Sequence, residues 1–345
     1  YLSERQWGTV REDYSVYGNA WDYIPHDMAR SRAYRWGEDG IGGISDNKQH
    51  ICLAFSFWNH RDKILKERLY GLAGSEGNHG EDVKELYYYV DSTPTHSYMK
   101  MLYKYPQNEF PYKQIIEENQ KRNRKDPEFE INETGIFDNN EYFDIVIEYA
   151  KADENDILIK LTAYNRNKKA APLTILPTLW FRNTWSWGYD AYKKSPMLTG
   201  IAKSQIEVSH QLLGKYKLYI EGADELLFCE NETNMERVFG KPNTSMYVKD
   251  GINNYVVAGK PNTLNPNKIG TKAAAKYTKK IAGGESCTIR LRFSQHTHNH
   301  QPFEDFDEIF TKRLKEADEF YAESQKDIKT EELKTIQRQA FAGMM

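Results

Sequence analysis

The chain has 345 residues, and its 47 Lys and Arg nearly balance its 50 Asp and Glu, which leaves a formal net charge of -3. This balance argues against a nucleic-acid platform, which normally carries a basic excess. No apolar run approaches the roughly 18 residues that a transmembrane helix needs, and the first residues show no hydrophobic run behind a basic start. We therefore expect no nucleic-acid partner, no membrane partner and no signal peptide.

The first 45 residues are rich in Trp, Arg, Asp and Gly and show little periodicity. Within them, the stretch 30–43 reads RSRAYRWGEDGIGG. A core strand would have to bury the charges between Arg32 and Asp39, and the four glycines that follow Trp36 would each cost roughly 1 kcal/mol in a helix. The stretch is therefore predicted to be a loop, and loops of this composition usually contact a ligand or a partner.

Strand patterns begin at residue 51. The runs 51–59 and 85–91 are apolar and of strand length, and 107–135 is a polar, charged surface excursion with about one helical turn. Residues 142–150 and 156–165 alternate between apolar and polar side chains across a short polar turn, which predicts a hairpin.

Further short strands are expected farther along the chain. Residues 273–294 contain two alternating runs joined by Gly283 and Gly284, which predicts a second hairpin. Many short strands separated by turn residues indicate a mainly β fold, an antiparallel β-sandwich of the supersandwich type, rather than a βαβ sheet. The other candidate strands are 173–183, 215–222, 225–231 and 254–259.

The pattern changes after residue 300. Apolar residues from Phe303 to Tyr321 recur every three or four positions and predict an amphipathic helix, and Thr330 is a plausible N-cap for a second one. We expect a sandwich domain at 1–300 and a helical linker at 301–345. Because the chain begins without Met and stops within a helical pattern, we expect it to be a fragment of a longer protein.

The cysteines and the searched motifs indicate neither a disulfide framework nor a cofactor site. Three well-separated cysteines (Cys52, Cys229 and Cys287) form no CxxC pair, which favours a reducing, cytoplasmic location. GEDGIGG does not match the dinucleotide fingerprint, and there is no nucleophile elbow, so no cofactor is expected. The histidines of HTHNH (His296, His298 and His300) could converge on zinc, but a polar strand end that leads into the following helix is the favoured interpretation, and no metal site is predicted.

Candidate ligand-contacting side chains cluster in three segments that contain glycine. The first 45 residues and 180–190 combine aromatic, arginine and carboxylate side chains, and 75–85 combines carboxylates with His79. Aromatic rings stack on sugar faces, and charged groups hydrogen-bond sugar hydroxyls. Salt-bridged interfaces use the same residues, and each segment could also be an ordinary turn. The candidate substrate-binding or interdomain residues are Trp7, Arg11, Trp36, Glu38, Asp39, Glu76, His79, Glu81, Asp82, Trp185 and Trp187.

The blocks 1–15, 20–43, 53–107 and 176–188 resemble the amino-terminal part of bacterial glucosidase-like proteins. These are related to glycoside hydrolase family 63, the mannosyl-oligosaccharide glucosidases, and to the mannosylglycerate-hydrolase-like group. The resemblance implies a β-sandwich followed by an (α/α)6 barrel that carries the inverting carboxylates and acts on α-glycosidic bonds of oligosaccharides. The catalytic pair has no matching position in this chain, so no catalytic residue is assigned.

Three functional hypotheses follow. The first is a non-catalytic amino-terminal domain that packs on the catalytic barrel and shapes its sugar site. The second is a free-standing carbohydrate-binding or scaffold module. The third, an active hydrolase within these residues, requires two carboxylates about 6.5–9.5 Å apart for inversion or about 5–5.5 Å for retention.

Two expectations concern surfaces. Trp36, Glu38 and Asp39 should share one face with parts of 74–82 and 182–188. In addition, a chain that lacks its barrel should expose apolar side chains of its last helix, namely Leu333, Ile336, Phe341 and Met344.

Overall fold

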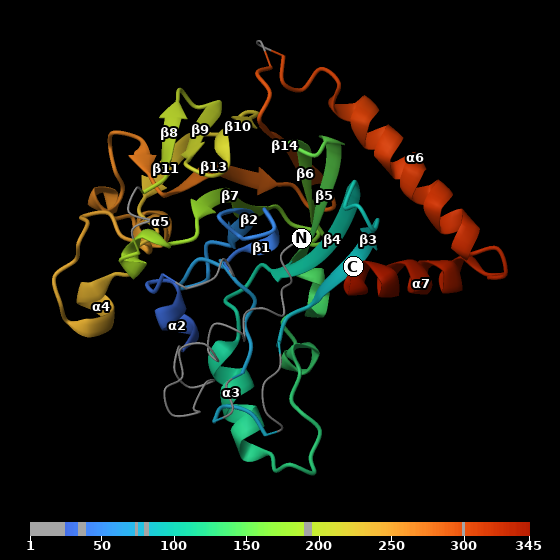
Figure 1. Ribbon diagram of the computed structural model, residues 1–345. Coiled ribbons are helices and arrows are strands. Elements are labelled where there is room, and N and C mark those ends of the chain that lie inside the picture. The colour runs from blue at the N-terminus through green and yellow to red at the C-terminus, as the bar shows by residue number, and fades with distance from the viewer. Residues whose placement is uncertain (1–24, 34–38, 73–74, 79–82, 190–194, 299–300) are drawn as a thin grey trace.

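The computed structural model describes residues 25–33, 39–72, 75–78, 83–189, 195–298 and 301–345. Among them, the strands form two antiparallel sheets packed face to face, and helices lie outside the sheets (Figure 1). The expected mainly β sandwich followed by two helices is confirmed.

The smaller sheet has five strands. In spatial order they are β1 (Ile41–Ser45), β2 (Ile51–Trp58), β7 (Ala171–Phe181), β13 (Lys272–Ile281) and β11 (Glu225–Cys229). β7 and β11 both pair with β13 in antiparallel fashion, so they run in the same direction. Their carboxyl ends therefore lie next to each other at one end of the sheet.

The larger sheet has nine strands. In spatial order they are β12 (Ile269–Gly270), β8 (Met197–Ile201), β9 (Gln205–His210), β10 (Gly214–Ile220), β14 (Ser286–Ser294), β6 (Asp156–Asn165), β5 (Tyr142–Asp153), β4 (Tyr98–Pro106) and β3 (Tyr87–Ser92). The predicted hairpin of β5 and β6 is confirmed, with Ile147 opposite Leu161.

The main core lies between the two sheets. Phe55, Phe57 and Ile175 of the smaller sheet meet Ile145 and Leu161 of the larger one, and all five are fully buried. Alternation in β5 and β6 supplies this core because every second side chain of a strand points to the same face.

Helices and short turns cover the outside. The α-helices are α2 (His26–Ala29), α3 (Tyr112–Lys121), α4 (Met235–Phe239), α5 (Gly251–Val256), α6 (Phe306–Ser324) and α7 (Glu331–Met344). The 3-10 turns are η3 (Ile131–Thr134), η4 (Asp138–Asn140), η5 (Trp185–Trp187) and η7 (Pro261–Thr263). None of the helices in the described ranges has both the length and the apolar character that spanning a bilayer requires.

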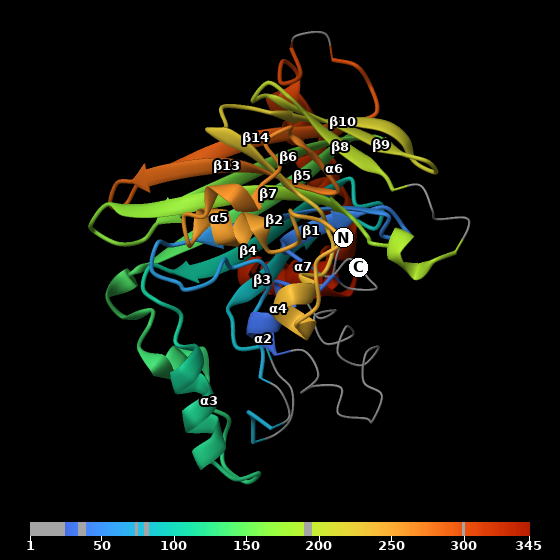
Figure 2. The same cartoon turned by 90° about the vertical axis from the view of Figure 1, so that its left-hand side faces the viewer.

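The two carboxy-terminal helices pack on the larger sheet (Figures 1 and 2). Phe306 and Phe310 of α6 contact Tyr98 and Leu158, and α7 lies against β3. The expected N-cap is present, since the Thr330 hydroxyl accepts a hydrogen bond from the Leu333 amide at 3.3 Å.

Three of the four apolar side chains of α7 that were expected to be exposed are exposed. Leu333 and Ile336 are each 54% exposed and Met344 is 83% exposed, whereas Phe341 is half-buried and stacks on Tyr321.

The predicted hairpin at 273–294 is wrong. β13 belongs to the smaller sheet and β14 to the larger, so residues 282–285 carry the chain from one sheet to the other. Gly283 is required because the backbone passes residue 168 closely: a Cβ atom there would lie 2.1 Å from the Lys168 carbonyl oxygen.

Three other local predictions also differ from the structure. Residues 251–256 form α5 rather than a strand at 254–259, because Ile252, Tyr255 and Val256 pack on the smaller sheet with helical spacing. The excursion at 107–135 contains the ten-residue α3 rather than a single turn.

The third difference concerns 30–43, whose last three residues form the start of β1 instead of a loop. Gly42 lets β1 approach the larger sheet, since a Cβ atom there would lie 2.6 Å from the Ile147 Cδ1 atom.

Candidate functional site: a tryptophan groove at one end of the smaller sheet

Pairing within the smaller sheet brings two distant segments together. Lys272 of β13 lies opposite Trp180 on one side and opposite Cys229 on the other. The segments that follow β7 and β11 therefore leave the sheet side by side. The Asn183 side chain donates a hydrogen bond to the Asn231 carbonyl at 2.9 Å, and the Asn231 side chain donates one to the Phe181 carbonyl at 2.8 Å.

A groove of about 790 Å³ opens at this end of the smaller sheet. We call it the tryptophan groove, and its lining includes Ala33, Trp185, Trp187, Glu232, Met235 and Thr244. A second hollow of about 390 Å³ shares Glu232 and Thr244 with it and is also lined by Glu230 and Thr271.

Each tryptophan of the groove has a charged neighbour. Trp185 donates its indole N–H to the Glu232 Oε1 atom at 3.1 Å, and the Thr244 hydroxyl donates to the other oxygen of Glu232. The guanidinium of Arg182 lies 5.3 Å from the centre of the Trp187 ring. Both tryptophans are only partly buried, so ring surface faces the groove.

Glu230 is a second carboxylate beside the groove. Its Oε2 atom accepts hydrogen bonds from the Thr271 amide at 3.1 Å and from the Thr271 hydroxyl at 2.6 Å. Burial raises the pKa of Glu230 against these hydrogen bonds, and the neighbouring Glu232 carboxylate raises it further. A carboxyl that is more easily protonated can donate as well as accept a hydrogen bond.

The amino-terminal segment forms one wall of the groove. The Ser31 hydroxyl donates to the Asp250 carboxylate at 2.5 Å, and the Ala33 amide donates to the Thr233 hydroxyl at 3.0 Å. Arg237 of α4 also reaches Ser31, with 2.8 Å between Nη1 and the hydroxyl oxygen. Ala33 and Trp185 line the same groove, so part of the predicted opening stretch lies near the predicted segment 182–188.

A buried ionic cluster lies beneath this end of the sheet. Lys249 contacts Asp39 with 2.6 Å between Nζ and Oδ2, Arg68 pairs with the other Asp39 oxygen, and Lys272 contacts Glu67 at 2.7 Å. Burial would raise the pKa of Asp39, but the three cations outweigh it and hold that pKa well below its usual range. Burial, together with Arg68 and Lys272, lowers the pKa of Lys249 to about 8 against the attraction of Asp39.

The candidate residues from the sequence have different positions. Trp185 and Trp187 line the groove, and Asp39 lies in the ionic cluster with its side chain only 10% exposed. Glu76 is half-buried in a segment that contacts α3 and the residues after it, where the Asn78 side chain donates to the Asn123 carbonyl at 3.2 Å. Trp7, Arg11, Trp36, Glu38, His79, Glu81 and Asp82 lie outside the described residues. The shared face of all three segments therefore stays a prediction.

Two of the histidines considered for zinc have ordinary partners. His296 Nε2 lies 2.8 Å from Asp153 Oδ2, and His298 Nε2 lies 3.2 Å from the Ser294 hydroxyl oxygen. His300 lies outside the described residues. Within the part of the chain that the structure describes, no group of three or more His, Cys, Asp or Glu side chains is placed to hold a metal ion.

Sequence reasoning missed Glu230 and Glu232. They follow β11 as the alternating carboxylates of CENE, and this pattern after a buried strand is the available signal. Their proximity to Trp185 depends on the pairing of both β7 and β11 with β13, which no local pattern encodes.

Comparison with known proteins gives one substantial match. No protein-family model matches the chain. It is 42% identical over 392 aligned positions to the uncharacterized protein YMR196W of Saccharomyces cerevisiae, and the match covers 100% of this chain and 36% of that protein.

Two solved structures show only distant similarity. One, described as a kojibiose phosphorylase from the human microbiome, is 10% identical, with a TM-score of 0.25 over 58% of this chain and 21% of its own. A polysaccharide lyase is 12% identical, with a TM-score of 0.32 over 76% of this chain and 27% of its own. At such scores, neither structure informs the function of this chain. The chain thus spans about a third of the length of a curated relative that matches it throughout.

Proposed function

We propose that this chain is a β-sandwich domain of a larger carbohydrate-active protein related to family 63 glucosidases. In this proposal the domain packs on a catalytic barrel, and the tryptophan groove forms part of the oligosaccharide-binding surface. The domain itself supplies no catalytic carboxylates. The observation that carries the proposal is the groove, which is lined by two partly exposed indole rings and by the Glu232 carboxylate that Trp185 and Thr244 hold.

The chemistry of the groove suits a sugar. Flat aromatic rings stack on the C–H face of a pyranose, and the carboxylates of Glu230 and Glu232 can accept hydrogen bonds from its hydroxyl groups. The greater length of the relative supports a setting with further domains. A cytoplasmic location is part of the proposal, and the three unpaired cysteines support it.

Titration of the chain with α-linked gluco-oligosaccharides, followed by tryptophan fluorescence and calorimetry, tests binding. We expect Trp187→Ala to weaken binding about tenfold, which corresponds to about 1.4 kcal/mol. Tyr88→Ala is the matched control, because Tyr88 is an exposed aromatic residue on the distant edge strand β3. Equal loss in both variants, or no binding by the unmodified chain and by the longer relative, would refute the proposal.

Hydrolysis provides a second test. The isolated chain should not turn over aryl α-glucosides or α-linked disaccharides, because the resemblance places the catalytic pair outside it. Measured turnover that Glu38→Gln or Glu81→Gln abolishes would contradict this assignment.

A further inference from the structure

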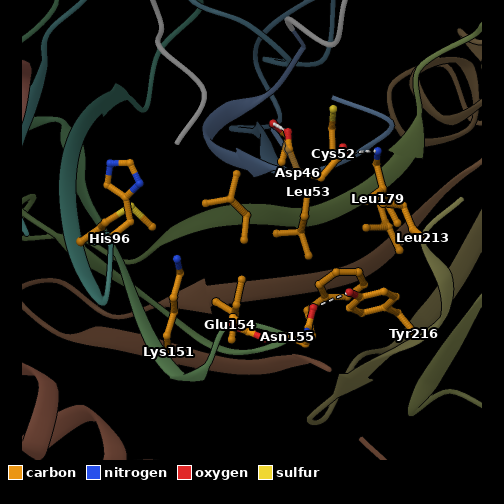
Figure 3. Close-up of a pocket in the computed structure, with 16 residues that line it drawn as sticks. Asp46, Cys52, Leu53, His96, Lys151, Glu154, Asn155, Leu179, Leu213 and Tyr216 are labelled. Carbon is orange, nitrogen blue, oxygen red and sulfur yellow. Dashed lines mark hydrogen bonds between the residues drawn. The ribbon is translucent and has the colours of Figure 1, made fainter. Parts of the chain in front are cut away.

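A cavity separate from the tryptophan groove and its neighbouring hollow lies between the two sheets (Figure 3). We call it the intersheet cavity. Its volume is about 210 Å³, and its apolar walls come from both sheets: Leu53 and Leu179 from the smaller one, and Met99, Ile157 and Phe293 from the larger one. An apolar cavity of about 150 Å³ is known to hold benzene. The intersheet cavity can therefore hold a benzene ring with one small substituent.

The rim of the intersheet cavity carries a lysine that has no counter-ion among the described residues. Lys151 lies near the end of β5, and its Nζ atom donates a hydrogen bond to the Thr95 carbonyl oxygen at 3.1 Å. No carboxylate among the described residues forms an ion pair with it, and burial lowers the pKa of its ammonium group. A half-buried cation without a counter-ion attracts an anion.

His96 stands on the same side of the rim as Lys151 (Figure 3). Its Nε2 atom lies 3.4 Å from the Met345 carbonyl oxygen. Burial lowers the pKa of His96, and so does the charge of Lys151. The two nitrogen groups thus bring basic side chains to one edge of an apolar chamber.

Two carboxylates also lie at the rim, but neither forms an ion pair with Lys151. Asp46 accepts hydrogen bonds from the Lys48 amide at 3.1 Å, from the Ile51 amide at 2.9 Å and from His50 at 3.0 Å, so residues of its own turn hold it. Glu154 is exposed to water, which screens its charge. Across the rim, the Tyr216 hydroxyl donates to the Asn155 side chain at 2.7 Å.

We propose that the intersheet cavity binds a small monocarboxylate with an apolar body, its ring or branched chain between the sheets and its carboxylate against Lys151 and His96. This site is separate from the tryptophan groove and does not depend on sugar binding there. Apolar walls with a few convergent polar groups at one edge are the usual composition of a small-molecule site.

Three probes of equal size and different charge test the proposal: benzoate, benzyl alcohol and benzylamine. Calorimetry and NMR titration of the full chain should show binding of benzoate. Benzyl alcohol should bind at least about tenfold more weakly, since a charge-assisted hydrogen bond contributes more than a neutral one, and benzylamine should not bind.

Three variants assign the binding to this cavity. Lys151→Met should remove the preference for benzoate over benzyl alcohol, and Leu213→Trp should fill the chamber and abolish binding of both. Lys217→Met is the matched control: Lys217 follows the cavity residue Tyr216 on β10, so it faces the opposite side of the sheet. Lys151→Arg, which keeps the charge, should retain the preference.

The outcomes are decisive in both directions. Preference for benzoate that is lost in Lys151→Met and kept in Lys151→Arg and Lys217→Met supports the proposal. Equal affinity for benzoate and benzyl alcohol, absence of binding by all three probes, or benzoate binding that Leu213→Trp leaves intact would overturn it. The comparison of the three probes on the unmodified chain remains valid even if a variant does not fold.

Discussion

Buried lysines have different surroundings in two regions of the molecule. In one region, three buried lysines each contact a carboxylate. Lys66 lies between β2 and the start of α3, and Lys249 and Lys272 lie beneath the tryptophan groove. At the intersheet cavity, Lys151 contacts only a carbonyl among the described residues. A buried pair of charges is satisfied within the fold, whereas a half-buried single charge is satisfied by water or by a ligand. The paired lysines therefore have a structural role, whereas Lys151 can contact the ligand of the proposed site.

The pair of Lys66 and Glu85 is the most enclosed example. Both side chains have 0% exposure, and Glu85 also accepts hydrogen bonds from the Tyr103 hydroxyl at 2.8 Å and the Tyr70 amide at 2.9 Å. The ammonium of Lys66 lies 3.9 Å from the centre of the Phe110 ring. Burial alone would lower the pKa of Lys66, but Glu85 outweighs it and holds that pKa above its usual range. Burial raises the pKa of Glu85 against the attraction of Lys66 and these hydrogen bonds.

Breaking this pair should have the largest effect. Glu85→Ala leaves the Lys66 ammonium buried without its carboxylate, and we expect a loss of about 3–5 kcal/mol in the free energy of unfolding. Urea denaturation measures it. The double variant Lys66→Met with Glu85→Leu is the control and should lose much less, because no charge stays buried alone. A loss below about 1 kcal/mol in Glu85→Ala would mean that the paired region does not depend on its charges.

The ionic cluster beneath the tryptophan groove should show itself as a dependence of stability on pH. The pKa of Lys249 is about 8 in the folded protein, against an ordinary value of 10.5. Between these values the unfolded chain binds the proton and the folded chain does not, so stability rises with pH. From a pH of about 8 to about 9.5 we expect a rise on the order of 1 kcal/mol.

Urea denaturation of the unmodified chain and of Lys249→Met across this range separates that rise from other groups. Tyrosines that titrate at high pH contribute equally to both proteins, so the difference between the two curves reports Lys249 and its neighbours Asp39, Arg68 and Lys272. Parallel curves would show that Lys249 keeps its proton throughout the range. Such curves would contradict the lowered pKa of Lys249 that burial and the neighbouring cations Arg68 and Lys272 cause.

The sequence predicted elements whose partners are close in the chain. β5 and β6 alternate regularly and are joined by a two-residue turn, so their pairing follows from local pattern alone. α7 could be located because Thr330 supplies an N-cap and apolar residues recur with helical spacing. In contrast, β13 and β14 alternate equally well, yet each pairs with strands from other parts of the chain. Alternation identifies a strand but not its partner.

The same limit applies to the candidate site. Trp185 and Trp187 could be identified because large aromatic residues in a short polar segment need a partner or a ligand. Glu230 and Glu232 reach the groove only through the shared pairing with β13. Asp39 was expected to meet a partner or a sugar, but its carboxylate binds Arg68 and Lys249, which come from distant parts of the chain. Charged residues indicate an interaction, and the tertiary structure determines whether that interaction is internal.

The smallest expected effect has the opposite sign and tests the comparison most directly. Lys151→Met removes a half-buried ammonium that lacks a carboxylate and loses one hydrogen bond to the Thr95 carbonyl. Methionine keeps most of the apolar length of the side chain. We expect the free energy of unfolding to stay constant or to rise by at most about 0.5 kcal/mol, whereas Lys66→Met should lower it markedly.

Urea denaturation with and without benzoate gives the readout. At ten times its dissociation constant, benzoate should stabilise the unmodified chain by about 1.4 kcal/mol and Lys151→Met much less, because a ligand stabilises only the state that binds it. Lys151→Gln, which keeps a hydrogen-bond donor but not the charge, should behave like Lys151→Met. A loss above about 1.5 kcal/mol in Lys151→Met without ligand would show that the ammonium is already satisfied within the fold. In that case Lys151 would belong with the paired lysines, and the intersheet cavity would have no electrostatic reason to select an anion.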